Sequence, residues 1–456
     1  MWGRLFNKLA VITMIFILST LSACTNYSNY DADTIGTGYI DSEFNNEESQ
    51  LYVRKNVAAT ETGYYYISQS PVHTGSYVKN YMYFFDIGSG KSTVLCSKLE
   101  CEHNDENCEA YLSGKQCVGS NIWYYNQRIY MIERTQEKDM LVSYDKNLRD
   151  KKNHMELSVD GNSVNATSQV SERTVINGDR LFYIVEESDA HCVYSVSLKE
   201  ESKPQLIKRY KFEHEVAELL TLYPVPGKIY MKMICVDENK KSYLCDVYDI
   251  ASNQVSNIYN SENDDINIRG EMPDVHTWNQ GVYIIDNNLF FATIEENKFI
   301  VNKLDVTTKK CEEIYTINAE EHNNTASYID IKGSDGKYIY ILEGLDPKRA
   351  RKETVNGNNL HIIDITGKHI DTMKLENYSE GDIRFDSFCI DKRYIFVTST
   401  YNIKGLELNE KQQQKYDELY KNAVITHEIP GISVMGVIDK KQIGTGEYSW
   451  INGTVD

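Results

Sequence analysis

A repeated aromatic marker constrains this chain more than any other feature. In seven places a polar turn is followed by a short run that alternates aromatic and aliphatic side chains, and successive runs lie 48 to 64 residues apart. The matched aromatics are Tyr66, Tyr130, Phe182, Tyr230, Phe290, Tyr340 and Phe396. Alternation with a period of two is typical of β-strands, and self-similarity at a fixed spacing indicates a repeat architecture.

A second marker follows the first in every repeat. It is an apolar strand-like run that ends in a short polar residue, and six of the seven end in aspartate. These residues are Asp86, Asp145, Ser197, Asp249, Asp305, Asp364 and Asp439. Because a short acceptor side chain can hydrogen-bond the backbone of a turn, we expect each to close a turn after its strand.

Further short apolar runs before and after the two markers give four strands in each repeat. Four antiparallel strands per unit of about 50 residues describe a β-propeller blade. We therefore predict an all-β fold, a single β-propeller over residues 51–456 with seven four-stranded blades, with six or eight blades as alternatives. An array of β-sandwich domains would need linkers, and no linker-like stretch interrupts the repeat. Ring closure is expected to use a terminal strand near residues 51–53 or near 448–451.

The last repeat carries an insertion. Residues 408–423 are rich in Glu, Lys and Gln, which have high helix propensity. We predict one helical insertion there, between the second and third strands of the last blade.

The N-terminal residues 1–23 predict a signal peptide. Arg4 and Lys8 are its only charges, and the apolar stretch that follows is shorter than the ~20 residues a membrane-spanning helix needs. Residues 24–50 then contain six acidic and no basic residues, which predicts a flexible acidic tether.

The end of the leader, Leu21-Ser22-Ala23-Cys24, resembles the bacterial lipobox, in which the cysteine becomes the lipidated first residue of the mature chain. The resemblance implies that Cys24 is the lipidation site; the alternative is an ordinary signal peptide with an incidental cysteine. Together with the Tyr-rich repeats, it makes the chain similar to Gram-positive surface lipoproteins with β-propeller repeats of unassigned function. It is also distantly similar to the propellers of lipoprotein-receptor ectodomains.

The widest spacing between markers contains a cysteine and histidine cluster, Cys96-x4-Cys101-x-His103-x4-Cys108. Three thiolates and an imidazole suit structural zinc in a tetrahedral site, and a similar cluster is implied by the lipoprotein resemblance. Disulfides and free thiols are the alternatives. The acidic residues of the loop, Glu109 among them, should repel one another unless a cation or a covalent bond holds the loop closed.

The sequence also predicts two spatial arrangements, one of a cysteine pair and one of the two insertions. A three-residue hairpin loop around Lys240 would set Cys235 opposite Cys245. The cysteine loop and the helical insertion should emerge on the same face of the ring, close together.

The net charge of −19 disfavours a nucleic-acid partner. No Gly-x-Ser-x-Gly motif occurs, and Gly88–Ser92 resembles the end of a phosphate-binding loop but lies between two strand-like runs. We therefore expect a membrane-anchored extracellular propeller that binds a protein, peptide or glycan on the face with the insertions. The alternative is an extracellular hydrolase or lyase with its active site in the axial channel.

Overall fold

The computed structural model describes most of the repeat region. The described residues are 38–39, 51–52, 57–69, 80–101, 103, 106–112, 122–134, 138–160, 162, 164, 173–199, 202–211, 217–237, 240–260, 283–285, 287–295, 298–318, 327–345, 359–374, 383–391, 393–402, 431–448 and 450–455. The predicted leader, residues 1–23, lies outside them. In the described part, no helix is long and apolar enough to cross a membrane.

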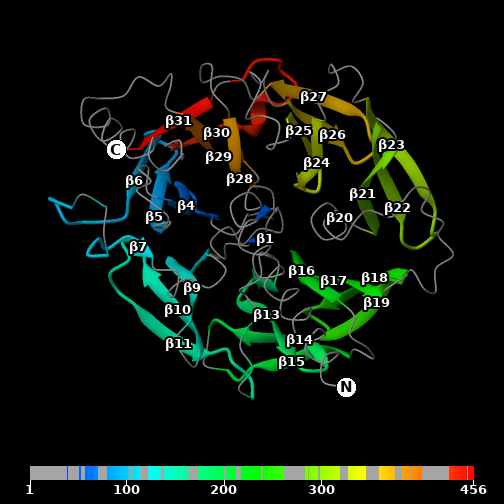
Figure 1. Ribbon diagram of the computed structural model, residues 1–456, viewed down its shortest axis with the longest axis horizontal. Helices are drawn as coiled ribbons and strands as arrows, with labels where there is room; N and C mark the ends of the chain where they lie inside the picture. Colours follow the sequence, from blue (N-terminus) through cyan, green and yellow to red (C-terminus); the bar gives the residue numbers. More distant parts are fainter. Residues whose placement is uncertain are drawn as a thin grey trace, which may run out of the picture.

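The strands are arranged radially around a central axis as a β-propeller (Figure 1). Five sheets have four antiparallel strands each. In chain order they are β8 (Ile122–Tyr125), β9 (Arg128–Arg134), β10 (Asp139–Asp145) and β11 (Lys152–Glu156); β12 (Thr174–Asn177), β13 (Arg180–Glu187), β14 (Ala190–Ser197) and β15 (Gln205–Lys211); β16 (Ala217–Val225), β17 (Lys228–Asp237), β18 (Lys240–Asp249) and β19 (Gln254–Asn260); β20 (Tyr283–Ile285), β21 (Asn288–Glu295), β22 (Lys298–Asp305) and β23 (Cys311–Asn318); and β24 (Ser327–Ser334), β25 (Tyr338–Leu345), β26 (Asn359–Asp364) and β27 (His369–Lys374).

The sixth sheet is composite and contains strands from both ends of the chain. Its eleven strands are β1 (Gly38–Tyr39), β2 (Leu51–Tyr52), β28 (Ile383–Ile390), β29 (Tyr394–Asn402), β30 (Gly431–Asp439), β31 (Trp450–Val455), β6 (Lys91–Val94), β5 (Asn80–Asp86), β4 (Gly63–Gln69) and β3 (Val57–Ala59), with β7 (Tyr111–Leu112) paired to β5. β1 belongs to the segment predicted to be a tether; it pairs with β2 and lies against β12 and β16 near the centre of the ring (Figure 1).

The prediction of seven separate four-stranded blades is wrong, because the described strands form six sheets. β31 pairs antiparallel with β30 and parallel with β6, at Thr454 and Lys91, so the strands of the first and last repeats share one sheet. The predicted use of a terminal strand in closure is confirmed by this pairing. The all-β prediction is also confirmed: the described residues contain no α-helix, and 3-10 geometry occurs at η4 (Lys440–Gln442) and at Arg173. The predicted helical insertion at residues 408–423 therefore finds no support, and that segment lies outside the described residues.

The marker aromatics form the core between the sheets. Six of them have described side chains with exposed fractions of 6% or less, and each lies on the second strand of its set: Tyr66, Tyr130, Phe182, Tyr230, Phe290 and Tyr340. Aromatic pairs join neighbouring sheets, as between Phe182 and Tyr248 with ring centroids 5.9 Å apart. Burying these large rings between sheets contributes a favourable free energy of folding that a single sheet could not gain.

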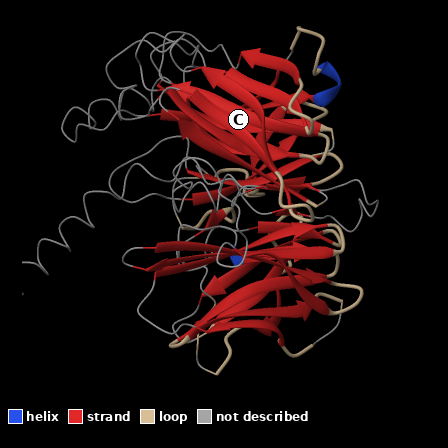
Figure 2. Ribbon diagram, turned by 90° about the vertical axis from the view of Figure 1, so that its right-hand side faces the viewer, coloured by secondary structure: helices blue, strands red, loops and turns tan. Residues whose placement is uncertain are grey.

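The terminal aspartates close turns as the sequence predicts. Asp249 Oδ1 accepts hydrogen bonds from the backbone N–H of Ser252, and Asp305 Oδ1 accepts from Thr307 and Thr308. Asp364 Oδ1 accepts from Thr366 in the same way. The described turns gather along one face of the propeller, where they are drawn as tan loops in Figure 2.

These turns predict that acid destabilises the fold. Backbone donors lower the pKa values of Asp249 and Asp305 in the folded state, and the Thr366 hydroxyl does so for Asp364. A lowered folded pKa contributes stability above the unfolded value of about 3.9 and loses it as the pH falls through the folded pKa. We therefore expect the urea unfolding midpoint to fall from pH 6 towards pH 3. The difference in urea unfolding midpoint between the native chain and Asp305→Asn should narrow over that range. A difference that stays constant would contradict a stabilising role for the Asp305 carboxylate in its turn.

Candidate metal centre

The cysteine loop emerges from the outer edge of β5. β6 pairs with the second half of β5 and β7 pairs with its first two residues, so the loop of residues 95–110 leaves and returns along the same strand. Leu95 N–H donates to Met82 O at 3.0 Å, and Met82 N–H donates to Ala110 O at 2.9 Å. Both ends of the loop are therefore fixed to a single residue of the composite sheet.

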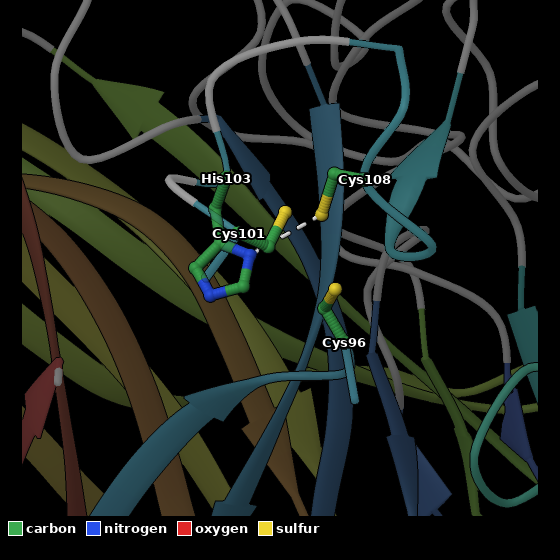
Figure 3. A group of neighbouring side chains, drawn as sticks. All are labelled: Cys96, Cys101, His103 and Cys108. Carbon is green, nitrogen blue, oxygen red and sulfur yellow. Dashed lines mark hydrogen bonds between the residues drawn. The ribbon is translucent and has the colours of Figure 1, made fainter. Parts of the chain in front are cut away.

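The structure brings all four predicted ligands together. Figure 3 shows the side chains of Cys96, Cys101, His103 and Cys108 converging, and their donor atoms all lie within 4.8 Å of one another. His103 Nδ1 lies 3.3 Å from Cys108 Sγ. Cys108 is 3% exposed, while the other three are half-buried. The loop thus converges on a small site with a buried floor and a more accessible rim.

His103 has an unusual backbone. Its φ of 52° lies in the left-handed region, which residues other than glycine rarely adopt. Such conformations cost free energy and concentrate where a side chain must be aimed at a ligand or catalytic site. The left-handed turn at His103 accompanies the convergence of its ring on the three thiols.

A clasp of polar contacts, formed by Ser97 and Glu109, joins the two arms of the loop beside the ligands. Ser97 N–H and Ser97 Oγ both donate to Glu109 Oε2 at 2.8 Å. Lys98 Nζ donates to the carbonyl oxygen of Asn107. Because Ser97 and Glu109 are the chain neighbours of Cys96 and Cys108, the clasp holds those two ligands in register. The sequence placed Glu109 among residues that repel one another, and its role in a cross-loop contact was not predicted.

The thiols differ in their ionisation. Burial raises the pKa of Cys108 to about 12, so its thiol is neutral at physiological pH when no cation is near. Burial also raises the pKa of Cys96, but hydrogen bonds from the backbone near Lys98 and Glu109 outweigh it and leave that pKa lowered. A bound metal reverses the effect of burial, because its charge deprotonates a coordinating thiol.

The geometry of the cluster could bind a metal ion. Metal–sulfur bonds of about 2.3 Å and metal–nitrogen bonds of about 2.0 Å in a tetrahedral site place the ligand atoms roughly 3–4 Å apart. The four donor atoms here lie within 4.8 Å of one another, and His103 Nδ1 and Cys108 Sγ are 3.3 Å apart. Cys96, Cys101 and Cys108 are free thiols in the structure, so none of the three is engaged in a disulfide. Four protein ligands would leave no coordination position for a substrate, which is the pattern of a structural site.

One cysteine placement predicted from the sequence is wrong. Cys235 lies opposite Ser242, and Cys245 lies opposite Lys232. The reason is the turn: Asp237 pairs with Lys240, so two residues and not three form the hairpin loop, and the register shifts. Cys24 and the predicted neighbour of the metal loop, residues 408–423, lie outside the described part of the chain.

No protein-family model matches the chain, and no curated protein sequence matches it. Among solved structures, it is similar to the β-propeller domain of the Trilobed protease from Pyrococcus furiosus, with 9% identity, 88% of this chain and 95% of that chain covered, and a TM-score of 0.42. A protein from Lactobacillus plantarum matches with 9% identity, 84% and 94% coverage, and a TM-score of 0.40.

A third similar structure is the acylaminoacyl peptidase of Pyrococcus horikoshii, with 9% identity, 90% of this chain and 53% of that chain covered, and a TM-score of 0.42. At these scores no activity is transferred from any of the three. The β-propeller fold of this chain rests on its own strand order and pairing.

Proposed function

We propose that this chain is a lipid-anchored, extracellular β-propeller that binds a protein, peptide or glycan at the cell surface, and that zinc organises part of its binding surface. The observation that carries the proposal is the convergence of Cys96, Cys101, His103 and Cys108 in a loop fixed at both ends to β5. Zinc fits this donor set because thiolates and imidazole in tetrahedral geometry are its preferred structural ligands. Loops held by a rigid scaffold are where binding residues concentrate.

Two observations favour binding at the loop over an enzyme site in the axial channel. Gly38–Tyr39 lies against the inner strands β12 and β16, so the chain itself takes up part of the axis. The loop carries Leu99, whose side chain is fully exposed, beside the acidic Glu100. An apolar side chain with a charged neighbour suits a contact with another macromolecule.

The proposed address is the outer face of the bacterial cell membrane. Residues 1–23 would be removed, Cys24 would carry the lipid, and residues 25–50 would link it to the propeller. The acidic chain would not replace the lipid by electrostatic attraction to an anionic membrane, since its net charge is −19.

Cys24→Ala should release the protein from the membrane. Each buried CH₂ of a lipid chain contributes roughly 0.8 kcal/mol to membrane binding, and the variant would lose all of them. Fractionation of cells after a high-salt wash measures this. Retention of the variant in the membrane fraction at the level of the native protein would disprove the anchor.

The protein purified without chelator should hold about one zinc per chain. His103→Ala removes a ligand and should lose most of the metal, whereas Glu109→Gln keeps all four ligands and should bind with an affinity lowered by about tenfold through the weakened clasp. Metal analysis and competition with a chromophoric chelator measure both quantities. All three loop cysteines should become alkylatable after chelation without reductant. Blocked thiols together with a metal content near zero would replace the zinc proposal with disulfides.

Binding should depend on the loop. We expect the zinc-loaded propeller, labelled and added to intact cells that lack the protein, to bind saturably, and Leu99→Ser to lower that binding about fivefold or more. Leu206→Ser is the matched control, because Leu206 is also exposed but lies on β15 of another sheet. Equal binding by both variants would exclude the loop as the contact surface, and no saturable binding by the native chain would exclude a cell-surface ligand under those conditions.

A further inference from the structure

The sheet of β24–β27 holds a chain of polar side chains that lies apart from the metal loop. β26 is paired on one side with β25 and on the other with β27, and the register sets Glu343 opposite Asn359 and His361 opposite Thr372. Side chains two residues apart on a strand point to the same face. Glu343, His361 and Thr372 therefore follow one another across three neighbouring strands on one face of the sheet.

Hydrogen bonds join Thr372 to His361 and His361 to Glu343. His361 Nε2 lies 2.9 Å from Glu343 Oε2, which also accepts from Asn359 Nδ2 at 3.0 Å. His361 Nδ1 lies 3.2 Å from Thr372 Oγ1. An ionised carboxylate only accepts hydrogen bonds, so Nε2 carries the imidazole proton and Nδ1 is left to accept the threonine proton. This is the hydroxyl, imidazole and carboxylate sequence of a nucleophilic triad, which is recognised by its geometry and not by residue order.

The burial of Glu343, His361 and Thr372 suits the roles of carboxylate, base and nucleophile in such a triad. The side chain of Glu343 is 5% exposed and that of His361 is 12% exposed, so the carboxylate and imidazole are held away from water. Thr372 is half-buried and lies on β27, the outermost strand of the sheet, at the rim of the propeller (Figure 1). The hydroxyl is therefore the member of the group that a ligand can approach.

A further donor lies beside the hydroxyl. His369, which is exposed, has its Nε2 2.8 Å from Thr372 Oγ1. Its ring stacks on Tyr315 of β23 in the neighbouring sheet, with centroids 6.1 Å apart and planes 11° from parallel. The stacking keeps the His369 ring beside the hydroxyl, from where an Nε2–H can turn to the carbonyl oxygen of an ester as Thr372 Oγ1 attacks its acyl carbon.

The geometry points to Thr372 as an acyl-accepting nucleophile, activated by His361 and oriented through Glu343, for short-chain carboxylic esters that reach the rim between these two sheets. Thr372 Oγ1 forms a bond to the acyl carbon and its proton passes to His361 Nδ1. The ester C–O bond then breaks, and the leaving alcohol takes that proton. Water, deprotonated by His361, attacks the acyl-threonine, and the threonine oxygen takes the proton back as the carboxylic acid leaves. Water is the only co-reactant.

The experiment uses p-nitrophenyl acetate with the zinc-loaded mature protein. We expect nitrophenol release with a burst of roughly one acyl group per chain, and an acetyl adduct mapped to Thr372 by peptide mass spectrometry. Thr372→Val, which keeps the shape of the side chain, should lose the burst and slow release by at least about tenfold. Thr372→Ser should retain it. Thermal unfolding of both variants checks that the fold is kept.

The chain offers an internal control. Ser143 Oγ lies 2.7 Å from His154 Nε2, but Ser143 is fully buried, so an ester cannot reach its hydroxyl. Ser143→Ala should leave release unchanged. A native protein with no acetyl adduct, or one whose adduct lies elsewhere, would overturn the proposal, as would equal release by Thr372→Val. The result does not bear on the zinc loop, because the two sites share no residue.

Discussion

The pairing of β31 with both β30 and β6 is the constraint on which the rest of the structure depends. A propeller sheet at the end of the chain would otherwise present an unpaired edge, and such edges recruit other chains. β31 removes this edge by joining the last strands of the chain to the first. Side chains strengthen the same junction: Arg393 donates to the carbonyl oxygens of Thr60 and Glu61, and Tyr64 donates to Asp391.

The ends of the cysteine loop are attached to the sheet that closes the ring. β6 lies between β5 and β31, and the loop begins directly after β6 and returns to β5 at β7. Met82 is hydrogen-bonded to both ends of the loop, next to Cys96 and close to Cys108. Because the four donor atoms already lie within 4.8 Å of one another, binding a metal there would cost less conformational entropy than assembling the site from an open loop.

The sequence predicted the features that depend on neighbouring residues. The buried aromatics and the turn-closing aspartates follow from a period of two and from local hydrogen bonding, and the structure confirms both kinds of residue. The convergence of Cys96, Cys101, His103 and Cys108 was also predicted, because one short loop contains all four. The number of sheets was not, since it depends on a pairing between Thr454 and Lys91, which no local pattern records. The predicted pairing of Cys235 with Cys245 was wrong for a related reason, because one residue more or less in a turn changes every partner along the hairpin.

The same dependence on register explains why the polar chain on β25–β27 has no signal in the sequence. His361 and Thr372 are eleven residues apart and meet only because a bulge lies between Ile362 and Ile363, just after the pair. Glu343 reaches His361 because β25 and β26 pair with Glu343 opposite Asn359, two residues before the histidine. A one-residue slip between β25 and β26 would put Glu343 and His361 on opposite faces of the sheet and leave each without the other. A slip between β26 and β27 would move Thr372 away from His361. A buried polar group costs free energy unless it is hydrogen-bonded, so the register that packs the core is also the register that assembles these three side chains.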